Sequence, residues 1–133
     1  MVKLDEFTLI WIWESKVETI AANELDAIID ELNEGEIKVK SKQELEEIVF
    51  KRLVDVLRRD LEEKLPETLL ERYGNFLIET DEGYAIVVDS KNVYEIVPRI
   101  IKKATNKDPV KYIAKKITKE FMKWITKQYA SKA

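Results

Sequence analysis

The stretch FLIETDEGYAIVVD, residues 76–89, decides the fold class that the sequence predicts. Two short runs rich in apolar and β-branched residues flank Asp81-Glu82-Gly83, where the glycine can adopt the positive φ angle of a tight turn. Residues 76–89 are therefore expected to form a β-hairpin. Since the patterns on both sides are mainly helical, the prediction is an α+β fold, dominated by helices, with a small sheet.

The segment EFTLIWIWE, residues 6–14, is rich in aromatic and β-branched residues, which predicts a buried strand. On a strand, Trp11 and Trp13 share one face, and we expect that face to lie in the core or in a subunit interface. The alternative is a platform on which bases stack. The capping box Ser15-Lys-Val-Glu18 then predicts a helix over residues 16–33.

A second long helix is expected after a short strand at residues 36–40, where apolar and charged residues alternate. Ser41-Lys-Gln-Glu44 is another capping box, and the helix is expected to end near Leu65 because Pro66 cannot continue it. Residues 66–73 then form a separate short helix. The wide apolar face of the long helix needs cover from the rest of the fold or from a second subunit. We expect a homo-oligomer in which this face and the strand over residues 6–14 form a homodimer interface.

Two further helices are predicted after the hairpin. Asp89 can cap a helical segment that contains Pro98, and Asp108-Pro109 is a strong start signal for an amphipathic basic helix over residues 109–129. No flexible linker or glycine-rich phosphate loop interrupts the chain, so residues 1–133 are expected to form a single domain.

The chain contains no cysteine and no histidine. These absences exclude disulfides, cysteine nucleophiles, cysteine-based metal sites, serine triads, HExxH metalloproteases and zinc deaminases. We therefore expect no cofactor and no metal, and favour a non-enzymatic function. The many glutamates and lysines and the few glycines predict a thermophilic, archaeal source. No apolar run is long enough to span a membrane and the start is acidic, so a cytoplasmic location is expected.

Charge is segregated along the chain. Residues 1–97 carry 12 basic and 24 acidic side chains, a net charge of −12, whereas residues 98–133 carry 11 basic and 2 acidic side chains, a net charge of +9. In the helix over residues 109–129, apolar residues fall on about a third of the circumference and lysines on most of the remainder. A segment of this kind predicts a partner that carries negative charge.

The leading hypothesis is a nucleic-acid-binding protein whose basic residues contact phosphates without reading bases. No arginine follows Arg99, which argues against bidentate recognition of guanine, so binding is expected to tolerate any sequence. The alternatives are an acidic partner, a self-associating assembly module, contact with a membrane surface, or lysines that are merely solvated or paired with the acidic body. The predicted binding residues are Arg99, Lys102, Lys103, Lys107, Lys111, Lys115, Lys116, Lys119, Lys123 and Lys127.

Asp89-Ser90-Lys91 follows a predicted strand with the D-x-K spacing of a nuclease metal site, in which a carboxylate holds magnesium and a lysine positions or activates water. These three residues resemble the signature of the PD-(D/E)xK nucleases. The resemblance implies a magnesium-dependent nuclease that uses Asp89 and Lys91 with an earlier acid, Glu79 or Asp81. In the alternative interpretation, Asp89 and Ser90 cap the next helix.

Overall fold

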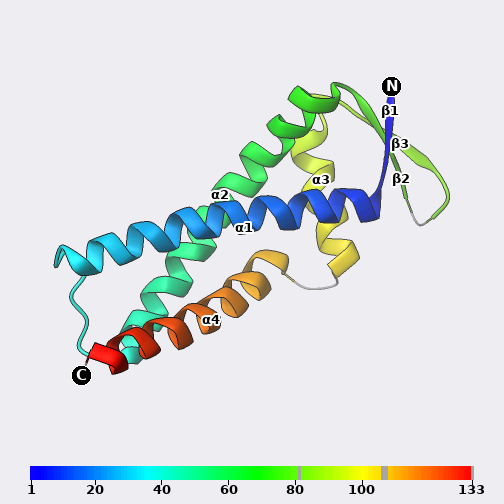
Figure 1. Cartoon of the computed structure of the whole chain (residues 1–133). Coiled ribbons are helices and arrows are strands. Elements are labelled where there is room, and N and C mark those ends of the chain that lie inside the picture. The colour runs from blue at the N-terminus through cyan, green and yellow to red at the C-terminus, as the bar shows by residue number, and fades with distance from the viewer. Residues whose placement is uncertain (81, 106–107, 133) are drawn as a thin grey trace.

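Four helices and three strands make up the described residues, 1–80, 82–105 and 108–132, of a computed structural model of the chain (Figure 1). In chain order the elements are β1 (Val2–Asp5), α1 (Glu6–Asn33), α2 (Lys42–Tyr73), β2 (Phe76–Glu79), β3 (Ala85–Val88), α3 (Val93–Thr105) and α4 (Pro109–Lys132). The predicted helix-dominated α+β fold with a small sheet is therefore confirmed.

The sheet has the strand order β1-β2-β3. β2 and β3 pair antiparallel, with Phe76 opposite Val88 and Glu79 opposite Ala85, so the predicted hairpin is confirmed. Gly83 has a φ angle of 89° in the turn, a conformation that glycine adopts without steric cost. β1 pairs parallel with β2, an arrangement that the sequence did not predict.

The prediction of a strand over residues 6–14, with a helix start at Ser15, is wrong. α1 begins at Glu6, directly after β1. Asp5 is the N-cap, and its carboxylate accepts a hydrogen bond from the Thr8 amide at 2.6 Å. This bond lowers the pKa of Asp5 below its ordinary value. The cap of α1 therefore lies ten residues before Ser15, where the capping box in the sequence predicted the helix to start.

Packing along the whole helix overrides the local strand propensity of residues 6–14. A helix buries Leu9, Trp13 and Val17 at four-residue spacing, in line with the buried residues further along α1. It also separates the two tryptophans, because Trp13 is 6% exposed whereas Trp11 is 60% exposed. The expectation that they share one buried face is therefore wrong.

α2 starts where the sequence predicts and ends later. Ser41 is the N-cap, and its hydroxyl accepts a hydrogen bond from the Glu44 amide at 3.1 Å. The strand expected at residues 36–40 is wrong, because these residues form an irregular connection. The end expected near Leu65 is also wrong, since α2 continues through Pro66 as far as Tyr73.

Burial explains why proline does not end α2. A proline inside a helix removes one backbone hydrogen bond and costs about 3 kcal/mol. Pro66 is itself buried, and Leu65 and Leu69, each 1% exposed, hold the helix against the core on both sides of it. Since a buried leucine contributes about 1.5–3 kcal/mol, packing offsets the lost hydrogen bond.

The start of α4 agrees with the sequence. Asp108 accepts a hydrogen bond from the Lys111 amide on Oδ1 at 3.3 Å, and Pro109 is the first helical residue. α4 ends at Lys132, slightly beyond the expected position. α3 continues through Pro98, as α2 does through Pro66.

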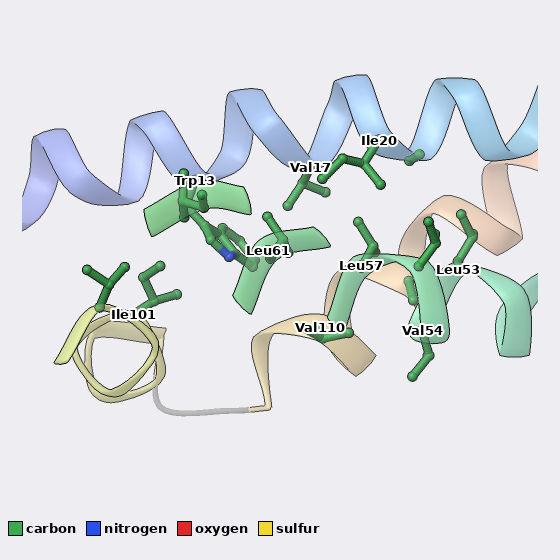
Figure 2. Packing of buried hydrophobic residues seen from close by; sticks show 14 of the residues in the cluster. Trp13, Val17, Ile20, Leu53, Val54, Leu57, Leu61, Ile101 and Val110 are labelled. Carbon is green, nitrogen blue, oxygen red and sulfur yellow. The ribbon is translucent and has the colours of Figure 1, made fainter. Parts of the chain in front are cut away.

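α2 lies between α1 and α4 and contacts both helices (Figure 1). The sheet lies at one end of the molecule, and the C-terminal end of α4 lies near the start of α2 at the other end. Figure 2 shows Trp13 and Val17 of α1 pointing toward Leu57 and Leu61 of α2, with Val110 of α4 on the far side of α2. One side of α4 packs against this core, and its other side is exposed to solvent.

Candidate functional site

The lysines of α4 form a row on its exposed side. Five of them follow at intervals of four residues, so each lies about 6 Å further along the helix axis than the one before. All five are exposed, and together they are the lysine row: Lys111, Lys115, Lys119, Lys123 and Lys127. Lys116 is exposed next to the row. α4 therefore presents a long basic surface.

The other side of α4 is anchored in the core. Thr118 is 2% exposed, and its hydroxyl donates a hydrogen bond to the Ala114 carbonyl at 2.7 Å. Trp124, which the sequence places on the apolar side, is 47% exposed. The buried apolar residues of this helix, among those described, are Val110, Ala114, Phe121, Met122 and Ile125. Because these residues hold the helix, the lysine row is kept on the solvent side.

Most of this basic surface is not neutralised by the part of the chain that the structure describes. Elsewhere cations are matched, as where Arg58 Nη2 lies 3.0 Å from Asp108 Oδ2. Within the described ranges, no carboxylate forms an ion pair within 4.0 Å with any of five α4 lysines: Lys111, Lys115, Lys116, Lys119 and Lys123. Among the described residues, no acidic side chain therefore neutralises these five charges.

The lysine row costs α4 stability. Like charges four residues apart on a helix destabilise it by about 0.2–0.5 kcal/mol per pair, and the row contains four such pairs in succession. The first turn of α4 contains no acidic residue, and Lys111 stands near the positive end of the helix dipole. A helix selected only for stability would alternate lysine with glutamate at these positions.

Lys103 at the end of α3 has a different environment. Its Nζ donates a hydrogen bond to Glu82 Oε1 at 2.8 Å. This bond, together with one from the Tyr84 hydroxyl, lowers the pKa of Glu82. Lys103 is therefore tied to the hairpin, although it is exposed.

The remaining predicted binding residues surround the connection between α3 and α4. Arg99 and Lys102 are exposed. Lys102 and Pro109 line the same cavity of about 270 Å³, so the end of α3 lies beside the start of α4. Lys107 lies outside the described residues. The structure thus brings the α4 lysines together on one surface and places Lys102 of α3 near its beginning, whereas Lys103 contacts the hairpin.

The D-x-K residues do not form a metal site with Glu79, one of the two acids that the resemblance implies. The Asp89 carboxylate accepts hydrogen bonds from the amides of Lys91 at 2.9 Å and Asn92 at 3.3 Å, as a capping residue does. Glu79 lies at the opposite end of the hairpin, about 13 Å away along the strands, which is too far for one magnesium ion to bind both acids. Asp81 lies outside the described residues.

Two further observations argue against a nuclease metal site at Asp89 and Lys91 among the described residues. In the described part of the chain, no group of three or more acidic residues is placed to hold a metal ion. The element order β1-α1-α2-β2-β3-α3-α4 also differs from the αβββαβ order of the PD-(D/E)xK nucleases. The resemblance is therefore confined to three residues that cap a turn.

Exposed aromatic side chains lie on α1 and on α4, and the sequence did not predict the exposure of those on α4. On α1, Phe7 is 80% exposed and Trp11 is 60% exposed, one helical turn apart. On α4, Tyr112 is 54% exposed, and Trp124 is 47% exposed. The spacing in the sequence could have indicated that Tyr112 is exposed, because Lys115 and Lys116 follow it at three and four residues, on the same side of a helix.

Over the described residues, no helix combines the length and the apolar character that crossing a membrane requires. The assignment of a function depends on the chemistry of the surfaces themselves, because no protein-family model, curated protein or solved structure matches this chain.

Proposed function

We propose that the protein is a non-enzymatic nucleic-acid-binding protein that uses the exposed side of α4. The observation that carries this proposal is the lysine row, whose members for the most part lack an acidic partner among the described residues. Lysine binds phosphate as a point charge, and α4 contains no arginine that could read guanine with a bidentate fork. Binding is therefore expected to depend on phosphates and to tolerate any sequence.

The dimensions of the row suit a polyanion. From Lys111 to Lys127 it spans 16 residues, or about 24 Å of helix axis. Double-stranded DNA carries one negative charge per roughly 1.7 Å of its axis, so several phosphates lie within reach of the row at once. The net charge of −12 on residues 1–97 repels nucleic acid from the rest of the protein and orients α4 toward it.

Substitution of Lys119 by glutamine tests the proposal through two effects of opposite sign. Removing its charge relieves two like-charge pairs, with Lys115 and Lys123, so the free energy of unfolding should rise by about 0.4–1 kcal/mol. Duplex affinity should fall, and the slope of log K against log salt should change from about −4.5 to about −3.6, because one phosphate contact is lost. Denaturant titration measures the first effect, and fluorescence anisotropy with a labelled duplex measures the second.

Lys91→Gln is the matched control, because Lys91 is also exposed but lies in the turn before α3. It should change neither duplex affinity nor the salt slope. Equal effects of the two substitutions would show that α4 is not the binding surface. Absence of salt-dependent binding by the unmodified protein, to duplex and single strand alike, would overturn the proposed function.

The exposed pair Phe7 and Trp11 favours self-association as a second function. Aromatic side chains bury about 150–250 Å² each, so this pair supplies the centre of an interface but less than the ~800 Å² per partner that a stable dimer buries. Replacing both by glutamate should convert a dimer of this chain into a monomer in sedimentation experiments, with unchanged helix content. Val87→Glu, on the 47% exposed Val87 of β3, is the control. Persistent dimers in the double variant would exclude this face.

A further inference from the structure

Tyr112 lies inside the basic surface of α4. Lys111 precedes it, and Lys115 and Lys116 follow at three and four residues, the spacing at which helix side chains are neighbours about 5–6 Å apart. All three lysines are exposed, and Tyr112 is itself 54% exposed. A phosphate held by Lys115 or Lys116 therefore brings its own nucleotide within reach of the Tyr112 ring.

Trp124 repeats this arrangement further along the helix. It is 47% exposed, Lys123 precedes it, and Lys127 follows three residues later. Its ring centroid lies 6.1 Å from that of Phe121, a buried residue, so the indole is supported from the core side. Both aromatic side chains that α4 exposes, among those described, are thus flanked by lysines.

The form of the nucleic acid decides whether such rings are used. In a duplex, base faces are stacked on one another, and a protein reaches only phosphates, sugars and base edges. In a single strand, base faces are free, and aromatic rings in a basic surface bind them by stacking without preference for sequence. Lysines can bind the phosphates of a duplex and of a single strand, whereas an exposed aromatic ring between lysines can stack only on the bases of a single strand.

We infer that α4 binds single-stranded nucleic acid, with the lysine row on the phosphates and the Tyr112 ring stacked on an unpaired base. The inference rests on the proposed function and specifies its ligand. Since both contacts use groups that DNA and RNA share, strands of the same sequence in DNA and RNA should bind with similar affinity. A duplex of that sequence should bind more weakly, through its phosphates alone.

Fluorescence anisotropy with a labelled DNA strand of about 20 nucleotides, its RNA counterpart and the corresponding duplex tests this inference. Tyr112→Ala should weaken single-strand binding about 5- to 100-fold, and Tyr112→Phe should retain it because phenylalanine also stacks. Duplex binding should be unchanged in both variants. The salt slope should also be unchanged, because stacking releases no counterions.

Tyr94→Ala is the matched control, since Tyr94 is 45% exposed on α3, away from the lysine row. It should leave every affinity unaltered. Unchanged single-strand affinity in Tyr112→Ala, or an equal loss on the duplex, would overturn the inference. If Lys119→Gln still weakened binding in that case, the proposed function would stand without it, so the two failures are distinguishable.

Discussion

Replacing Lys115, Lys119 and Lys123 together by glutamine should reduce duplex affinity about a thousandfold at 50 mM salt. Five phosphate contacts, by Lys111, Lys115, Lys116, Lys119 and Lys123, correspond to a salt slope of about −4.5, and loss of three contacts reduces it to about −1.8. Between 50 and 200 mM salt, the affinity of the unmodified protein should then fall about 500-fold and that of the variant only about 12-fold. Fluorescence anisotropy over this salt range measures both values.

A triple substitution of the same three lysines by arginine separates charge from structure. Arginine keeps the positive charge at every position, so the salt slope should remain near that of the unmodified protein. The glutamine variant should be at least as resistant to denaturant as the unmodified protein, because like-charge pairs along α4 are removed. An unchanged salt slope in the glutamine variant would place nucleic-acid binding on another surface.

Two substitutions test α1, Trp13→Ala and Trp11→Ala, and Trp13→Ala is expected to be the more destabilising of them. Trp13 is 6% exposed and points into the core beside Leu61 (Figure 2). Removing a buried tryptophan side chain costs about 3–5 kcal/mol, a large share of the 5–15 kcal/mol that stabilises a typical domain. Urea unfolding of the dilute protein, followed by circular dichroism, measures the loss.

Trp11→Ala provides the contrast that depends on the helix. Trp11 is 60% exposed, so its removal should change the free energy of unfolding by less than about 0.5 kcal/mol. On a strand the two tryptophans would share one face and their removal would cost similar amounts. Similar losses for Trp11→Ala and Trp13→Ala would therefore contradict a helix that begins at Glu6.

The starts of α2 and α4 could be predicted because their capping hydrogen bonds join neighbouring residues. Ser41 accepts from the amide three residues later, and Asp108 does the same at the start of α4. The hairpin needs only a glycine in its turn and apolar runs on either side. In each case the decisive atoms lie within a few positions in the chain, so local sequence is sufficient.

The basic surface could be predicted in part. The four-residue spacing of lysines and the apolar side of the helix together imply an exposed basic side. That spacing does not reveal whether carboxylates from residues 1–97 approach the lysines, because this depends on how α2 and α4 pack. The aromatic members of the surface, Tyr112 and Trp124, were missed because exposed and buried aromatic residues look alike in sequence.

By itself, the sequence determined the starts of α2 and α4, the hairpin and the concentration of positive charge in the last 36 residues. Only the tertiary structure decided that residues 6–14 are helical, that α2 continues through Pro66, and that β1 pairs with β2. It also decided that most of the lysine row has no acidic partner among the described residues. The reason is physical: each of these outcomes depends on contacts between segments far apart in the chain, and their packing energy outweighs local propensity.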